Sequence, residues 1–318
     1  MFLQSSMNFA SEESRVALLR KSIQRSFAGI ACLCLLGATS ACHQAPAARF
    51  QVTWERDLPY ASRADRTLYL DIARPRDARV PVPGVLLLHG GAWQSNDRRM
   101  MSKLASALAS LGYVAVAIDL RKSIDHDGDF PAAVEDALAA LRFMRERADR
   151  CGLDPHRVAV LGESSGGHTA LMAAYGTYEQ DAAAPSPVQA VIGLMAPADL
   201  ELLYRDNPHG SGHAWLRDLL GASPAENHEA YRAASPVDLA KPGLPPTLLI
   251  HGDRDGIVSI RHAEVLRDRL SQAGDRCWFA RVSGGTHSVV GLFRSAEGAR
   301  YLPVITQFLA SVFPEATP

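Results

Sequence analysis

The 318-residue sequence lacks several features that mark particular classes of protein. It has only five cysteines, and no two of them have the C-x-x-C spacing of a metal site. Lys plus Arg number 33 and Asp plus Glu number 34, so no net basic charge exists to attract nucleic acid. Internal repeats and low-complexity tracts are also missing. We therefore expect no metal, no cofactor and no nucleic-acid partner, and the sequence does not indicate an oligomeric state.

The sequence also lacks an apolar run long enough to cross a membrane. Its longest candidate, residues 27–41, has 15 residues, fewer than the roughly 20 that a bilayer core requires. Basic residues precede this run, and small residues end it before Cys42. This order of charged, apolar and small residues is typical of a secretory signal, so residues 1–41 are set apart from the folded part of the chain.

The cysteine after the small residues resembles the lipidated cysteine of bacterial lipoproteins. Thr39 stands where that family usually has Leu, so ordinary cleavage after Ala41 remains an alternative. We expect a signal peptide at 1–41, a tether at 42–49 and a folded domain at 50–318. The protein would then be lipid-anchored in the bacterial cell envelope through Cys42, or else periplasmic or secreted. Cys151 and Cys277 could pair in such a compartment or remain buried thiols.

What the sequence does contain is a rhythm of strands and helices. Uninterrupted apolar runs are typical of strands buried on both faces of a parallel sheet, and they occur at 85–88, 113–118, 158–161, 190–195 and 248–250, with a last strand at 278–282. Alternating patterns at 50–54 and 67–72 predict antiparallel edge strands bounded by Pro59 and Pro75. Helices are expected at 104–111, from Pro131 to near Gly152, after Ser164, and at 304–312. This predicts an α/β fold with a mostly parallel sheet of about eight strands and helices on both faces.

One segment breaks this rhythm. Residues 199–241 are rich in Pro, His, Gly and Trp and lie between two expected strands, with a helical stretch at 215–220. We interpret the segment as a small lid or cap inserted near the site, and the alternative is an ordinary long connection.

The sequence Gly162-Glu163-Ser164-Ser165-Gly166 follows an apolar strand and precedes a helical segment. A G-x-S-x-G sequence between a strand and a helix is typical of a nucleophile elbow, a sharp turn that needs small neighbours around a strained serine. Ser164 would project above the sheet, and the amide of Ser165 would face an anion formed there.

A serine nucleophile needs a base and an orienting acid, which follow it in the order acid and then histidine in this architecture. Two candidate acids, Asp253 and Asp255, come directly after the strand at 248–250. His287 lies in a loop after the last strand and is the only histidine beyond His262. The residues alone leave the choice between the two aspartates open.

These motifs together resemble the α/β-hydrolase superfamily. The sequence His89-Gly90-Gly91-Ala92-Trp93 is similar to the H-G-G-x-W motif of esterases, and residues 162–168 and 234–237 resemble the BD-FAE branch, which is feruloyl and acetyl-xylan esterase-like. The resemblance implies Ser164, Asp255 and His287 as the catalytic triad. It also implies an oxyanion hole formed by the amides of Gly91, Ala92 and Ser165. Trp93 is then either a wall of the pocket or a buried aromatic residue that supports the loop.

The activity implied is that of a serine carboxylic-ester hydrolase acting through an acyl-enzyme on a small or carbohydrate-linked ester. The same triad could hydrolyse an amide bond, as in a formamidase or peptidase. A non-catalytic lipoprotein with the hydrolase fold is a third hypothesis, which a missing triad residue would favour. His168 and Glu163 are expected to pack or make local contacts rather than to catalyse.

Overall fold

The computed structural model describes residues 48–63, 66–125, 127–176, 187–207, 211–287 and 301–314. All of these residues belong to one unit of the chain. Residues 1–41 and Cys42 lie outside the described ranges, so the signal and its lipidation site stay predictions. Within the described ranges, no helix combines the length and apolar character that a membrane crossing requires.

Strands and helices alternate along most of the described chain. The strands are β1 (Val52–Ser62), β2 (Thr67–Pro75), β3 (Val82–Leu88), β4 (Val114–Ile118), β5 (Leu153–Glu163), β6 (Ala190–Leu194), β7 (Thr247–Gly252) and β8 (Cys277–Val282). The helices are η1 (Arg98–Met101), α2 (Ser102–Ser110), α3 (Ala132–Glu146), α4 (Ala148–Cys151), α5 (Ser165–Tyr175), α6 (Leu200–Asp206), α7 (Ser211–Leu220), α8 (His228–Ala233), η2 (Pro236–Leu239), α9 (Arg261–Ala273) and α10 (Tyr301–Val312).

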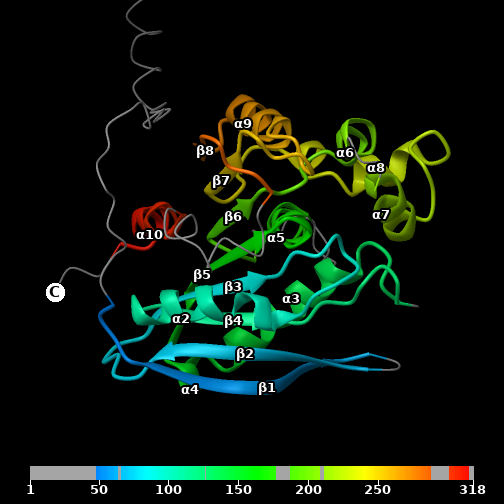
Figure 1. Cartoon of the computed structure of the whole chain (residues 1–318). Helices are drawn as coiled ribbons and strands as arrows, with labels where there is room; N and C mark the ends of the chain where they lie inside the picture. The colour runs from blue at the N-terminus through cyan, green and yellow to red at the C-terminus, as the bar shows by residue number, and fades with distance from the viewer. Residues whose placement is uncertain are drawn as a thin grey trace, which may run out of the picture. The chain divides into compact units, whose positions relative to one another are not determined.

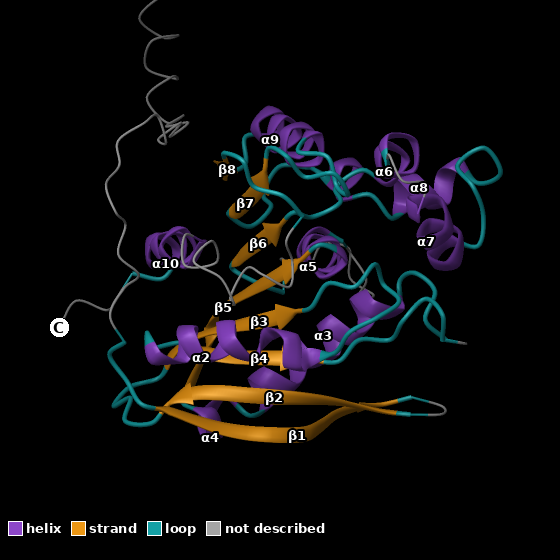
Figure 2. Ribbon diagram, viewed as in Figure 1, coloured by secondary structure: helices purple, strands orange, loops and turns teal. Residues whose placement is uncertain are grey.

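The eight strands form one sheet in the order β1-β2-β4-β3-β5-β6-β7-β8 (Figures 1 and 2). Strands β4, β3, β5, β6, β7 and β8 pair in parallel, whereas β1 and β2 are antiparallel to their neighbours. The α/β-hydrolase fold class predicted from the sequence is therefore confirmed. The parallel core places the carboxyl ends of β3, β5 and β7 at one edge, where a site in an open α/β sheet is expected.

Two apolar cores cover the two faces of the sheet. On one face, α3, α5 and α9 pack against side chains of β2 to β7. On the other face, α2 and α10 pack against the alternate side chains of the same strands. Successive residues of a strand point to opposite faces, so fully buried runs such as Val85–Leu88 contribute to both cores.

The segment predicted as an insertion is helical. It contains α6, α7, α8 and η2 between β6 and β7. The helices α6, α7 and α8 lie close together (Figure 1), and their apolar side chains form a third core. Trp93, which follows β3, and Val258, which follows β7, belong to this core. The insertion therefore packs on the loops at the carboxyl ends of the parallel strands.

Three expectations about single elements were wrong. β2 is not an edge strand, because β4 pairs with its other side and Leu70–Ala73 are buried. Pro59 lies inside β1 rather than bounding it, which is tolerated because β1 is an edge strand. The helix expected from Pro131 to Gly152 is divided at Arg147 into α3 and α4.

Candidate active site

The elbow at Ser164 has the strained geometry that its sequence predicts. Ser164 has φ 54° and ψ −122°, a conformation that is uncommon for a residue with a side chain. A Cβ on Gly162 would overlap the carbonyl oxygen of Gly166, and a Cβ on Gly166 would overlap carbonyl oxygens at the end of β3. Glycine is therefore required at both positions. The amide of Ser164 donates to the carbonyl of Leu194, 2.8 Å away, and this bond fixes the elbow against β6.

The structure brings together Ser164, His287 and Asp255. The Oγ of Ser164 lies 3.0 Å from Nε2 of His287, and Nδ1 of His287 lies 2.6 Å from Oδ2 of Asp255. A carboxylate accepts hydrogen bonds, so Nδ1 of His287 carries the proton and Nε2 is left to accept from the serine hydroxyl. This arrangement lets His287 remove the proton when Ser164 attacks a carbonyl carbon.

The carboxylate of Asp255 is fully buried and held by several donors. Its Oδ1 accepts the amides of Ile257 and Val258, each at 2.9 Å, and its Oδ2 also lies 3.4 Å from Nε2 of His251. Burial alone would raise the pKa of Asp255. The contacts with His251 and His287 and the backbone bonds outweigh burial and hold this pKa well below its usual range. Asp255 is thus a stable anion that can stabilise an imidazolium at His287.

Asp253 points to a different set of partners. Its Oδ1 accepts the amide of Gly284 at 2.7 Å, and its Oδ2 accepts Nε of Arg281 at 3.3 Å. The Gly284 bond and the Arg281 contact lower the pKa of Asp253. These contacts fix the turn after β8 and include none with His287. The geometry therefore distinguishes the two aspartates that the residues alone left open.

The oxyanion turn, residues 90–93, lies beside the elbow. Gly91, Ala92 and Trp93 have consecutive positive φ values of 134°, 54° and 59°. The carbonyl of Gly91 accepts the amides of Gln94 and Ser95, whereas within the described ranges no hydrogen bond uses the amides of Gly91 and Ala92. The amide of Ser165 opens α5, where a helix has no internal acceptor. All three predicted donors are therefore available to an anion.

Trp93 is 8% exposed, and its ring packs in the core of the insertion. Its Nε1 donates to Nδ1 of His168 at 3.2 Å, and its carbonyl accepts the amide of Ser123 at 2.8 Å. This is the placement of a residue that supports the oxyanion turn. The role of pocket wall stays a prediction.

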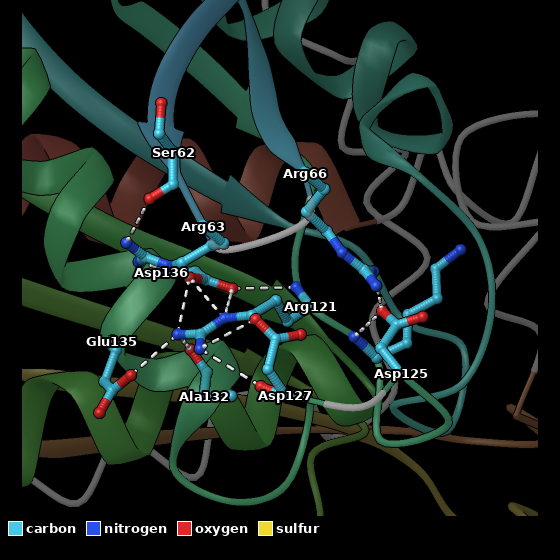
Figure 3. A network of polar contacts seen from close by, with 10 residues as sticks. Ser62, Arg63, Arg66, Arg121, Asp125, Asp127, Ala132, Glu135 and Asp136 are labelled. Carbon is cyan, nitrogen blue, oxygen red and sulfur yellow. Dashed lines mark hydrogen bonds and ion pairs between the residues drawn. The ribbon is translucent and has the colours of Figure 1, made fainter.

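The loop that carries Ser123 is fixed by the Arg121 network, which consists of Arg63, Arg121, Glu135 and Asp136 (Figure 3). The guanidinium of Arg121 contacts both oxygens of Asp136 at 3.0 to 3.1 Å and Glu135 at 2.8 Å. Arg63, at the end of the β1–β2 hairpin, donates to the carboxylate of Asp136 at 2.8 Å. The network ties the hairpin, the loop after β4 and α3 together behind the oxyanion turn.

Two further residues contribute to the site and were not predicted to do so. Nε2 of His251 donates to the carbonyl of Val258 at 2.8 Å, which fixes the turn that holds Asp255. Its signal in the sequence is its place at the end of β7, four residues before Asp255. His168 donates from Nε2 to the carbonyl of Ala234 at 2.8 Å, so it contacts the insertion as well as Trp93.

Glu163 is buried beside the nucleophile, and burial raises its pKa well above the usual range. Its Oε1 has no partner within the described ranges. Cys151 and Cys277 are not joined by a disulfide bond. No cluster of three or more His, Cys, Asp or Glu side chains suited to a metal ion occurs among the residues that the structure describes.

Comparisons with known proteins find similarity to esterases. The BD-FAE family model matches residues 70–270. The chain is similar to Esterase LipC of Mycobacterium tuberculosis, with 29% identity over 254 residues, which are 75% of this chain and 60% of LipC. It is also similar to the ethyl acetate hydrolase of Pseudomonas putida, with 28% identity over 76% of this chain and 78% of that enzyme. Among solved structures, the thermophilic esterase Est2 of Thermogutta terrifontis matches with a TM-score of 0.67 and 25% identity, over 85% of this chain and 95% of Est2.

Proposed function

The chain belongs to the BD-FAE family, and on that premise we propose that it is a carboxylic-ester hydrolase that acts through an acyl-enzyme on Ser164. One observation carries the proposal: hydrogen bonds at 3.0 and 2.6 Å join Ser164 to His287 and His287 to Asp255, beside a turn in which the amides of Gly91 and Ala92 have no partner among the described residues. The chain spans about 60% of the length of LipC. The proposed activity therefore rests on the site in this chain and is not taken over from LipC.

In the proposed reaction, the Oγ of Ser164 attacks the ester carbonyl and His287 takes its proton at Nε2. The negative charge that develops on the carbonyl oxygen is stabilised by the amides of Gly91, Ala92 and Ser165. His287 then donates its proton to the departing alcohol oxygen, which leaves the acyl group on Ser164. A water molecule, deprotonated by His287, attacks the acyl-enzyme. The bond between the acyl group and Oγ of Ser164 breaks, His287 returns the proton to Oγ, and the acid is released. Asp255 stabilises the imidazolium in both halves of the reaction.

The substrate we propose is a small or carbohydrate-linked ester. Support comes from the BD-FAE match and from the relatives, which include an ethyl acetate hydrolase and Esterase LipC. The insertion packs on Trp93 and on the loop that carries Asp255, so its helices lie where they can limit the size of the acyl or alcohol group.

Labelling of the nucleophile tests the mechanism. An organophosphonate probe should add to Ser164, as located by peptide mass spectrometry. Ser164→Ala should lower kcat by about 10³-fold or more while the protein stays folded. A label on Ser165 instead would contradict the assignment. No label and no turnover in the wild type would favour a non-catalytic protein.

A substrate panel tests the ester assignment. It should contain p-nitrophenyl acetate through decanoate, methyl ferulate, acetylated xylan and aminoacyl anilides. We expect turnover of the short esters or of the carbohydrate-linked and feruloyl esters. Faster turnover of anilides than of esters would contradict the proposal and favour an amide-bond hydrolase.

We also propose that the protein is anchored in the bacterial cell envelope by lipid on Cys42, because small residues after an apolar run precede this cysteine. Cys42→Ala should release active protein into the soluble periplasmic fraction. Wild-type protein that is soluble without detergent would contradict the lipid anchor and favour ordinary secretion.

A further inference from the structure

His168 is a buried imidazole in the first turn of α5, and its backbone amide donates to the carbonyl of Ser164 at 3.0 Å. Both ring nitrogens are occupied. A backbone carbonyl only accepts, so the bond to Ala234 requires a proton on Nε2. An indole N–H only donates, so the bond from Trp93 requires a lone pair on Nδ1. His168 therefore has one defined neutral tautomer, and burial lowers its pKa to about 4.

Trp93, the partner of Nδ1, belongs to a segment with an uncommon backbone conformation. Ala92 and Trp93 have φ values of 54° and 59°, which are unfavourable for residues with a side chain. Such a conformation persists only where surrounding contacts fix it. The carbonyl of Trp93 is held by the amide of Ser123, and its side chain is held by His168. The two rings meet edge to face, with centroids 5.1 Å apart.

The Ala234 partner lies at the base of the insertion, directly after α8. The next residue, Ser235, donates from Oγ to the carbonyl of Tyr231 and accepts the amide of Leu200 at the start of α6. The position of Ala234 is thereby fixed to two helices of the insertion. His168 connects this fixed point to the oxyanion turn across the first turn of the nucleophile helix.

We propose that His168 is a positioning residue for oxyanion stabilisation, which holds the backbone of Ala92 and Trp93, and with it the amide of Ala92, in place through the indole of Trp93 and is itself aligned by Ala234. This inference rests on the proposed esterase function. It assigns His168 no contact with substrate. It predicts that the loss of either bond lowers kcat, since the oxyanion forms in the transition state, and changes KM little.

Two substitutions remove the same bond from opposite sides. Trp93→Phe keeps the ring but removes the indole donor, and His168→Gln keeps a donor that can reach Ala234 but removes the acceptor for Trp93. Each should lower kcat for p-nitrophenyl acetate about 10-fold with KM within about twofold, because small misplacements of positioning groups have effects of this order or larger. The double variant should be no worse than the more impaired single variant, since both act on one bond.

His168→Asn and Trp278→Phe are the controls. The side-chain oxygen of Asn stands near the place of Nδ1, so His168→Asn should recover part of the kcat lost in His168→Gln. Trp278 also sits in an edge-to-face pair, with Phe308 at 5.2 Å, but lies in β8 against α10. Trp278→Phe should leave kcat unchanged, although it should change the melting temperature about as much as Trp93→Phe does.

The outcomes separate this inference from the proposed function. Wild-type protein that neither turns over esters nor takes a label on Ser164 would overturn the function itself. An active wild type with unchanged kcat in Trp93→Phe, or with losses in Trp93→Phe and His168→Gln that multiply in the double variant, would overturn only the role of His168. If His168→Gln does not fold, the kcat of Trp93→Phe is compared with that of Trp278→Phe. A lower kcat in Trp93→Phe alone supports the role of His168, and equal values overturn it.

Discussion

Asp255 and Asp136 are two carboxylates whose side chains are fully buried, and each accepts several hydrogen bonds. They differ in their partners. Asp136 is held by the guanidinium groups of Arg121 and Arg63 (Figure 3). Asp255 is held by the imidazole of His287, by backbone amides and by the nearby His251.

The difference between these partners distinguishes a carboxylate that supports the fold from one that is proposed to take part in the reaction. Arginine stays charged at any pH at which the fold survives, so Arg121 and Arg63 hold the surrounding loops together but cannot take part in proton transfer. An imidazole can accept a proton and return it during a reaction, so in the proposed mechanism Asp255 stabilises the charge that forms when His287 takes the proton of Ser164. Burial and multiple hydrogen bonds alone therefore do not distinguish the proposed catalytic carboxylate from a supporting one. The ability of its partner to transfer a proton does.

The largest effect expected on the reaction is that of Asp255→Asn. The amide cannot stabilise an imidazolium and favours the wrong tautomer of His287, so kcat should fall by about 10⁴-fold while the fold is kept. Steady-state kinetics would measure kcat, and circular dichroism would show whether the fold is kept. A kcat within tenfold of the wild type would remove Asp255 from the triad.

Asp136→Asn should give the opposite result. It leaves Arg121 buried without its main counter-charge, so the free energy of unfolding should fall by about 3–5 kcal/mol. The kcat of the protein that remains folded should change far less than in Asp255→Asn. Urea denaturation would measure the free energy of unfolding. The kcat of the folded protein would be measured as activity per mole of Ser164 that the organophosphonate probe labels.

A surface pair provides the control for this stability change. Asp268 contacts Arg267 with its side chain 58% exposed, so Asp268→Asn should alter stability by less than about 1 kcal/mol. Equal destabilisation by Asp268→Asn and Asp136→Asn would mean that the Arg121 network does not support the fold in the way described.

Glu163 extends the comparison to a buried carboxyl group that has no cationic partner among the described residues. Its pKa is raised in the folded protein, so the unfolded chain releases this proton first, and stability is lost as pH rises above about 4.3. Glu163→Gln removes this proton linkage. Its stability relative to the wild type should therefore rise between pH 4 and pH 7 in urea denaturation series. A constant difference across that range would show that Glu163 is ionised in the folded protein.

The smallest effect is expected for Asp253→Asn. The amide oxygen of Asn can still accept the amide of Gly284, and the contact with Arg281 lies at the surface. Both kcat and melting temperature should stay close to those of the wild type. A loss of activity like that of Asp255→Asn, at unchanged melting temperature, would reverse the assignment of the two aspartates.

The parts of the site that follow from local rules were predictable from the sequence. The elbow needs glycines two residues before and after Ser164, and both stand where carbonyl oxygens leave no room for a Cβ. The strand runs identified the sheet because burial on both faces leaves an uninterrupted apolar pattern. α9 was not predicted, although His262, Leu266 and Leu270 are spaced for one helix face and Gly274 follows in a left-handed conformation.

The supports of the site were not predictable, because they join distant parts of the chain. His168 contacts Trp93 across 75 positions and Ala234 across 66. A histidine inside a helix carries no local sign of such partners. The choice between Asp253 and Asp255 likewise depends on which loop each side chain faces, and only the family resemblance favoured Asp255.

Within the described residues, β1 and β8 are the two edge strands of the sheet, and the structure of β1 has a consequence for how molecules of this protein meet. An exposed strand edge is a template on which a second molecule can add its own strand, the first step toward aggregates. Along β1 the pairing is interrupted between Glu55 and Leu58 and again between Pro59 and Ala61. Pro59 has no amide hydrogen to offer an incoming strand. The outer edge of β1 is therefore a poor surface for continuing the sheet, and the interruptions help to keep crowded copies of the protein apart.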